Sequence, residues 1–125
     1  MFNDLKILNV ASALARHSVQ RHAQVAENIA NSDTPGYKAK DLEPFSQAYA
    51  KSERAAMDAR ASGSVNHAYR AETIKIAGVA SPDGNTVALE DQMTRSTASV
   101  RDHDTALTVY SKTLSMLRTT LGGRG

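Results

Sequence analysis

The side chains of this chain that could carry out chemistry are its four histidines and the acidic residues beside them. Two histidines hold a metal ion from one helix face when they lie three or four residues apart. His17 and His22 are five residues apart, and neither His67 nor His103 has a second ligand at a suitable spacing. We therefore expect no metal site, and we expect histidines in packing seams or at the surface.

Catalytic and phosphate-binding patterns are missing as well. Asp102 and Asp104 flank His103, but neighbouring helix positions point in different directions and cannot orient a catalytic imidazole. The chain has no Gly-x-Ser-x-Gly elbow for a serine nucleophile, and no Gly-rich loop leads into a helix that would bind phosphate. The sequence thus predicts a protein that is not an enzyme and has no catalytic residues and no cofactor.

The most informative stretch is residues 26–37, which read Ala-Glu-Asn-Ile-Ala-Asn-Ser-Asp-Thr-Pro-Gly-Tyr. Pro35 disfavours helical geometry at Thr34, so a helix should end near Asn31, which tolerates the left-handed conformation of a helix terminus. Pro35 and Gly36 suit the central positions of a type II turn, where Gly supplies the positive φ. On turn chemistry alone, an ordinary exit from a helix is the more frequent explanation of this stretch.

Residues 3–32 are predicted to form one helix. Its apolar and small residues step by three and four, as in a coiled-coil seam, and a second apolar set flanks that seam. We expect one flank to contact the chain itself and the other to contact neighbouring subunits, with a helix in a small bundle as the alternative. The seam consists of Leu5, Leu8, Ser12, Ala15, Val19, His22, Ala26 and Ile29, and the flanking set of Ile7, Val10, Ala11, Leu14, Ser18 and Val25.

Residues 88–121 are predicted to form a second long helix. Asn85 or Thr86 is a candidate N-cap, and Gly122 follows the last seam residue. We expect Tyr110 to pack in the core, because it falls on the seam, and Tyr37 to fold back onto the first helix. The seam consists of Met93, Ser96, Val100, His103, Leu107, Tyr110, Leu114, Leu117 and Leu121.

The predicted fold is mainly α. Helices of about 45–50 Å are too long for a compact globule of this size, so the two should pack side by side as a coiled-coil-like hairpin. The middle segment is expected to be extended or partly β, with a short helix between Phe45 and Met57, a strand at 73–76, a turn at 82–85 and a flexible stretch at 61–64. The chain divides into residues 1–37 (N-terminal helix and exit turn), 38–87 (middle segment) and 88–125 (C-terminal helix and tail).

Composition limits the chain to one structural unit with few large apolar residues. Leu, Ile, Val and Phe account for 23 of the 125 residues, and much of the other hydrophobic content is Ala. Such a chain builds only a small core, so we expect partners to complete it and the isolated subunit to be partly disordered. The net charge of +2 argues against nucleic acid as a partner, and no apolar run approaches the roughly 20 residues that span a bilayer.

Residues 27–31 (Glu-Asn-Ile-Ala-Asn) followed by 34–38 (Thr-Pro-Gly-Tyr-Lys) resemble the N-terminal signature of the bacterial flagellar axial proteins, which are the rod, hook and hook-associated subunits. Residues 39–42, 81–87 and 110–118 resemble the proximal rod proteins within this family. The resemblance implies a structural subunit of the proximal flagellar rod whose terminal helices join an α-helical axial tube that transmits torque. A stand-alone coiled-coil adaptor is the alternative.

The resemblance also implies partners and a location. The expected partners are other rod proteins, FliE, the basal-body ring and export gate region, and further copies of the chain, without nucleic acid or membrane insertion. The expected location is the flagellar basal body, reached through the flagellar type III apparatus without a cleavable signal peptide. The residues predicted to carry the signature and the subunit packing are Asn28, Ile29, Asn31, Thr34, Pro35, Gly36, Tyr37, Leu107, Tyr110, Leu114, Leu117 and Leu121.

Overall fold

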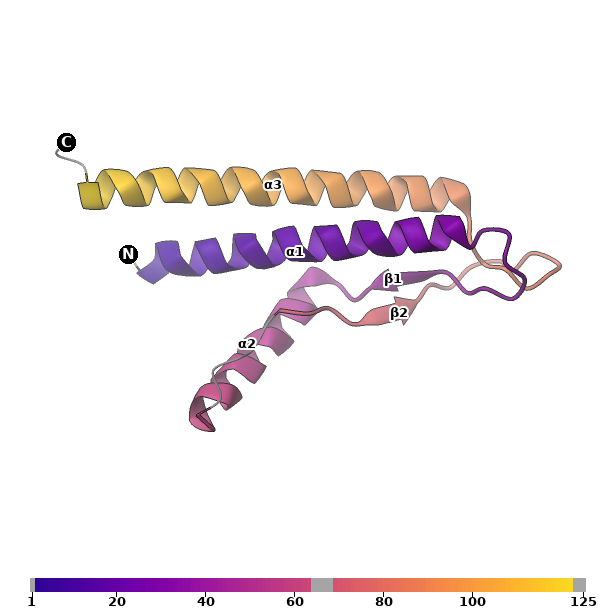
Figure 1. Cartoon of the computed structure of the whole chain (residues 1–125), viewed down its shortest axis with the longest axis horizontal. Coiled ribbons are helices and arrows are strands. Elements are labelled where there is room, and N and C mark those ends of the chain that lie inside the picture. The colour runs from indigo at the N-terminus through magenta and orange to yellow at the C-terminus, as the bar shows by residue number, and fades with distance from the viewer. Residues whose placement is uncertain (1, 64–68, 123–125) are drawn as a thin grey trace.

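A computed structural model describes residues 2–63 and 69–122. Two long antiparallel helices, α1 and α3, lie side by side, and a smaller arm packs against α1 and points back along it (Figure 1). The predicted fold class is confirmed: the chain is mainly helical, its terminal helices pack together, and the middle holds short strands. The elements are α1 (Phe2–Ala30), β1 (Lys40–Leu42), α2 (Phe45–Ala61), β2 (Thr73–Lys75) and α3 (Leu89–Gly122).

A stripe of small and polar side chains joins α1 to α3. The buried residues of α3 recur every seven positions at Gln92, Ser99 and Ala106, and continue at Thr113. A seven-residue repeat keeps one face of a helix turned toward its neighbour. Ser18 is their buried counterpart in the middle of α1. Because Ser18, Ser99, Ala106 and Thr113 are small, the two backbones can approach closely there without large apolar residues between them.

The predicted seams are therefore not the surface that the two helices bury against each other. Val19 is 57% exposed, Val100 50% and Leu107 48%. The seam of α1 is centred roughly 80° around the helix from the buried row of Ala11, Ser18 and Val25, at 100° per residue. Those three residues belong to the predicted flanking set, so the flanking set of α1 faces the rest of the chain. Tyr110, expected in the core, is 37% exposed at the edge of the interface.

The arm is a two-stranded antiparallel sheet of β1 and β2, and α2 lies between these two strands in the chain. The register of β1 and β2 pairs Lys40 with Lys75, Asp41 with Ile74 and Leu42 with Thr73. The predicted strand and short helix are both present, whereas β1 was not predicted, because its sequence Lys-Asp-Leu has no apolar alternation. A small cluster of Leu42, Ala48 and Ala71, with Tyr69 beside it, holds the sheet to α2.

Buried apolar side chains are mostly alanine in the part of the chain that the structure describes. Apart from Val25, Leu42 and Leu117, the buried hydrophobic residues are Ala. The largest fully buried side chains are instead polar, namely Gln92 and Asn28. Polar contacts therefore position the elements to an unusual degree, and partial disorder of the isolated subunit stays a prediction. Ser64, which ends the predicted flexible stretch, and His67 lie outside the described residues.

Candidate subunit-packing site

The end of α1 is built by the residues of the predicted exit. The helix ends at Ala30, and the Asn31 N–H donates to the carbonyls of Glu27 and Asn28, both at 3.1 Å. Asn31 does not adopt the left-handed conformation considered for it above. Every described residue other than glycine has a negative φ. The next turn is as predicted: the Tyr37 N–H donates to the Thr34 carbonyl at 3.2 Å, and Gly36 between them has a φ of 74°.

Asn28 connects α1, the exit and both neighbouring elements. Its side chain is fully buried, and its amide nitrogen donates to the Lys40 carbonyl at 2.7 Å and to Gln92 Oε1 at 2.9 Å. Its amide oxygen accepts hydrogen bonds from the Tyr37 hydroxyl at 3.0 Å and from the Lys40 N–H at 3.2 Å. Tyr37 thus folds back onto the helix as predicted. One side chain thereby fixes the exit, β1 and α3 to the last turns of α1.

Asn85, in the loop before α3, also binds the exit turn through its side chain. It is not the N-cap of α3 that the sequence suggested. Its amide nitrogen donates to the carbonyls of Asn31 and Thr34, both at 2.8 Å. Beside it, the Thr86 N–H donates to the Tyr37 carbonyl at 3.0 Å. Because Asn85 is held by the exit turn, α3 begins only at Leu89.

A glycine allows the two loops to meet, which gives a first prediction. Gly84 has a φ of 88°, and a Cβ there would lie 3.4 Å from the Cα of Gly36. Gly84→Ala should lower the free energy of unfolding by about 1–3 kcal/mol, through backbone strain and crowding. The matched control is Gly63→Ala, since Gly63 has a φ of 76° and open space around it. Urea unfolding of both variants checks this, and equal losses would exclude crowding at Gly84.

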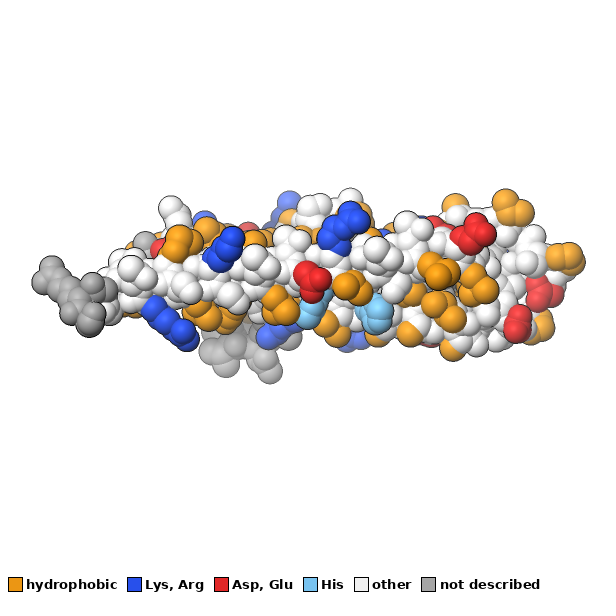
Figure 2. Space-filling model, turned by 90° about the horizontal axis from the view of Figure 1, so that it is seen from above, with side chains coloured by type: hydrophobic (Ala, Val, Ile, Leu, Met, Phe, Trp, Pro, Cys, Tyr) orange, Lys and Arg blue, Asp and Glu red, His pale blue; other side chains and the backbone are white. Residues whose placement is uncertain are grey.

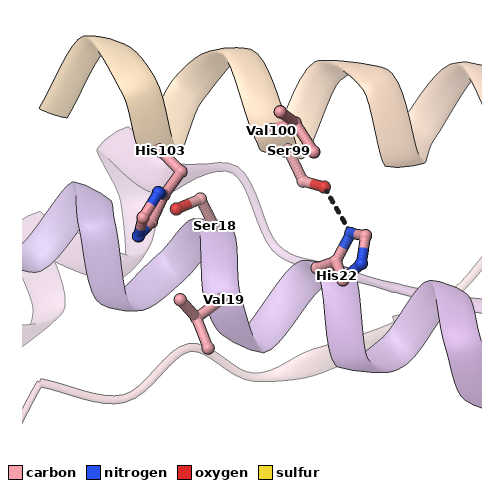
Figure 3. Close-up of a pocket in the computed structure, with 6 residues that line it drawn as sticks. All are labelled: Ser18, Val19, His22, Ser99, Val100 and His103. Carbon is pink, nitrogen blue, oxygen red and sulfur yellow. Dashed lines mark hydrogen bonds between the residues drawn. The ribbon is translucent and has the colours of Figure 1, made fainter. Parts of the chain in front are cut away.

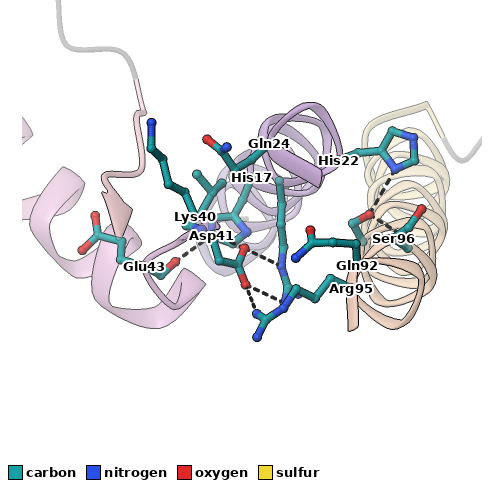
Figure 4. A network of polar contacts seen from close by, with 12 residues as sticks. His17, His22, Gln24, Lys40, Asp41, Glu43, Gln92, Arg95 and Ser96 are labelled. Carbon is teal, nitrogen blue, oxygen red and sulfur yellow. Dashed lines mark hydrogen bonds and ion pairs between the residues drawn. The ribbon is translucent and has the colours of Figure 1, made fainter. Parts of the chain in front are cut away.

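A charged cluster ties the arm to both long helices (Figure 4). Arg21 of α1 donates two hydrogen bonds to the Asp41 carboxylate, each at 3.0 Å, and Arg95 of α3 donates another. Burial would raise the pKa of Asp41, but hydrogen bonds from Arg21 and from the Leu42 N–H, with the charges of both arginines, hold that pKa below its ordinary value. The carboxylate stays ionised and fixes the start of the arm.

His17 and Glu43 secure the other side of the arm. The His17 imidazole donates from Nε2 to the Glu43 carbonyl at 2.9 Å, and its ring packs edge-on against Phe45 at 5.6 Å. Hydrogen bonds from Lys51 at 2.8 Å and from the Glu72 N–H at 3.0 Å lower the pKa of the buried Glu43 carboxyl. These contacts orient the arm. Within residues 2–63 and 69–122, no three His, Cys, Asp or Glu side chains converge as a metal site.

The predicted seams of α1 and α3 meet along one side of the helix pair. Their residues line a hollow of about 220 Å³, together with Ser18 and Ser99 (Figure 3). A second hollow of about 200 Å³ lies nearer the N-terminus of α1. We call this surface the α1–α3 groove; its lining residues are Ser18, Val19, His22, Ser99, Val100 and His103 in the first hollow, and Ala11, Ser12, Ala15, Ala106, Leu107 and Tyr110 in the second.

The α1–α3 groove and the arm lie on different sides of α1. His17 contacts the arm, and Val19 lines the groove two residues later, about 200° around the helix. Viewed from the α3 side, apolar side chains extend along the length of the molecule, with histidines near its middle (Figure 2). Apolar residues that are exposed along a whole helix pair mark a surface for protein contacts.

The structure separates the predicted packing residues into two places. Those from Asn28 to Tyr37 build the junction at the start of α3, where Asn28 is buried and Ile29, Thr34 and Pro35 are exposed. Along α3, Leu107 and Tyr110 line the α1–α3 groove, Leu114 is half-buried, Leu117 is buried and Leu121 is 69% exposed. Five residues that hold the arm, α1 and α3 together are not among the packing residues predicted from the sequence. These are Arg21, Asp41, Asn85, Gln92 and Arg95, of which only Gln92 could have been found, through its seven-residue spacing from Ser99.

Comparison with known proteins bears on the same junction. The sequence model of the family described as flagella basal body rod protein matches residues 7–38, which cover most of α1 and the exit turn. No curated protein matches the chain. No helix of the described residues combines the length and the apolar character needed to cross a membrane.

The matched family is structural rather than enzymatic, and it supports a structural role in the rod of the flagellar basal body, in association with other basal-body components. The family implies the flagellar basal body as the location of the chain. The match supports the predicted resemblance: residues 7–38, which form most of α1 and the exit turn, are similar to the flagellar basal body rod proteins.

Proposed function

We propose that this chain is a proximal rod subunit of the FlgB type, and that it assembles through its terminal helices into the axial tube that transmits torque. The observation that carries the proposal is the α1–α3 groove. Its apolar residues, such as Val19, Val100 and Leu107, follow coiled-coil spacing yet remain exposed in the single chain. A third helix placed in the groove would bury them, which is the main favourable term in protein association.

The remaining partners and the route of export are part of the same proposal. Other rod proteins and FliE would contact the helix pair, and the basal-body ring and export gate would lie close by. A subunit whose buried apolar residues are mostly Ala unfolds at low cost, which suits passage through the flagellar type III apparatus. The junction residues from Asn28 to Tyr37 would set the angle between the arm and the tube, because their hydrogen bonds connect the two.

The test replaces an apolar residue of the α1–α3 groove by a charged one. Leu107→Asp should abolish swimming and rod assembly when it replaces the chromosomal copy, because a carboxylate would be buried between subunits. Motility agar and electron microscopy of basal bodies are the measurements. Leu107 serves better than Leu117, which is buried in the single chain, so that Asp at 117 would also damage folding.

Thr108→Asp is the matched control. Thr108 is exposed and follows Leu107, and it lines a depression on the outer side of α3 instead of the groove. This variant should swim, and circular dichroism of both purified proteins should match the wild type. Normal swimming of the Leu107→Asp strain would rule out the groove as the assembly surface. A stable dimer in sedimentation, together with intact rods in a deletion strain, would favour the stand-alone adaptor.

A further inference from the structure

The two edges of the small sheet in the arm are covered to different extents. β1 lies between α1 and β2, and α1 covers its outer edge (Figure 1). The Asn28 amide bonds to both the N–H and the carbonyl of Lys40, as the backbone of a neighbouring strand would. Gln20 binds Ala71, before β2, in the same way. β2 itself contacts no described helix or strand except β1, so its outer edge is the open edge of the sheet.

The register shows which backbone groups lie on the open edge of β2. Ile76, just after β2, donates its N–H to the Ala39 carbonyl at 2.9 Å and so faces β1. In an antiparallel pair, such positions alternate with positions whose N–H and carbonyl point away from the partner strand. Ile74 therefore faces β1 as well, whereas the backbone groups of Thr73 and Lys75 point outward. Among the described residues, no backbone group bonds to these outward groups.

The side chains of the open edge also lack partners. Lys75 lies directly opposite Lys40, and like charges in opposite positions destabilise a pair of strands. Lys40 has the Glu27 carboxylate at 3.9 Å, whereas the ion pairs of the described residues do not include Lys75. Ile74 is 47% exposed. The open edge thus offers backbone donors and acceptors together with one unpaired cation and one apolar side chain.

An extended polypeptide segment is the partner that fits these groups. A strand repeats its outward N–H and carbonyl groups every second residue, which is the spacing of Thr73 and Lys75. A helix uses the same groups internally and could not reach them. An acidic side chain beside Lys75 would supply the missing counter-charge, and an apolar side chain beside Ile74 would bury it. A sheet of only two strands is marginally stable, and a third strand strengthens it.

We propose that the open edge of β2 binds an extended segment of a neighbouring rod subunit, with an acidic residue beside Lys75 and an apolar residue beside Ile74. The segment becomes the third strand of the sheet and holds the arm to the next subunit. This inference rests on the proposed function, because it needs a neighbouring subunit in the assembled rod. It concerns the arm, which lies on a different side of α1 from the α1–α3 groove.

Lys75→Glu separates folding from binding. The introduced carboxylate lies opposite Lys40, so the isolated chain should be at least as stable as the wild type in urea. The same carboxylate repels the acidic residue of the incoming strand. We expect about a tenfold loss of basal bodies with complete rods, counted by electron microscopy, and a matching loss of swimming. Arg54→Glu is the matched control: it makes the same charge change at an exposed residue of α2 and should leave rod assembly unchanged.

Thr73→Pro tests the backbone contact without changing any charge. It removes an outward N–H, and proline is tolerated on an edge strand where the N–H does not bond to the sheet. The isolated chain should therefore unfold near the urea concentration of the wild type, while rod assembly falls about tenfold. Ile76→Pro is the comparison, because its N–H bonds to Ala39, and it should unfold at a clearly lower urea concentration.

Normal rod assembly in either the Lys75→Glu or the Thr73→Pro strain would overturn the inference, as would an equal loss in the Arg54→Glu strain. Hydrogen exchange of the isolated chain, followed by NMR, tests the open edge itself. The amides of Thr73 and Lys75 should exchange at least about tenfold faster than those of Ile74 and Ile76, and equal rates would also overturn it.

The Leu107→Asp strain separates this inference from the proposed function. If Leu107→Asp prevents rod assembly while both edge variants assemble normally, the α1–α3 groove stands and the third strand falls. If Leu107→Asp assembles normally, the proposed assembly surface itself is wrong.

Discussion

Asn28→Ala should be among the most damaging single substitutions for the stability of this chain. It removes five hydrogen bonds, which connect Asn28 to Gln24, to Tyr37, to Gln92 and to both backbone groups of Lys40. Gln92 is fully buried, so its amide would lose a partner where water cannot replace it. With about 1–3 kcal/mol for each buried group left unsatisfied, we expect a loss of about 3–5 kcal/mol in the free energy of unfolding, measured by urea denaturation.

Asn31→Ala is the matched control, three residues along the same motif. The Asn31 side chain bonds to the Glu27 carbonyl at 2.9 Å and to the Thr34 hydroxyl at 3.1 Å, and both contacts are exposed. Water replaces such partners, so the loss should stay near or below about 1 kcal/mol. Equal losses for the two variants would contradict the central role of Asn28. The two asparagines look alike in the sequence, and this comparison tests their different burial.

Asp41→Asn should have the second large effect. The substitution keeps the shape of the side chain but leaves Arg21 without its carboxylate partner and Arg95 with only the more exposed carboxylate of Asp91. Removing one partner of a buried ion pair costs about 3–5 kcal/mol, and we expect about 2–4 kcal/mol here, since both arginines keep some contact with water. Asp91→Asn is the control: Asp91 binds the same Arg95 at 2.7 Å, but its side chain is 44% exposed. Asp91→Asn should lower the free energy of unfolding by only about 0–1 kcal/mol.

The effect of Asp41 should also appear as a pH dependence of stability. Its pKa is lower in the folded chain than its ordinary value of 3.8, so its stabilising contribution is complete well above that value. The contribution is lost as the pH falls below 3.8 and through the folded pKa, because the carboxyl must then be protonated. As the pH is lowered from 7 to 2, the free energy of unfolding should fall less steeply for Asp41→Asn than for the wild type. If the two proteins lose the same free energy of unfolding over this range, protonation of Asp41 is not coupled to folding.

The arm contains the features that could not be predicted from the sequence. The strand at Thr73–Lys75 was predicted from its alternation, but β1 was not, because its residues Lys40 to Leu42 carry no apolar pattern. Asp41 and Arg95 are 54 residues apart, and no local rule connects them. Their contact depends on the antiparallel packing of α3 beside α1, which brings the start of α3 next to the end of α1.

The sequence by itself determined the helical class, the length of both helices, the position of the exit turn and the resemblance to flagellar rod proteins. These features follow from local periodicity, Pro and Gly geometry and a contiguous motif, all of which act over short distances along the chain. Only the tertiary structure decided which side of each helix is buried. Ala11, Ser18 and Ser99 allow the helices to meet at close range, and the arm occupies the opposite flank of α1. The large apolar residues Val19 and Leu107 are thereby left facing outward, where we propose that another subunit covers them.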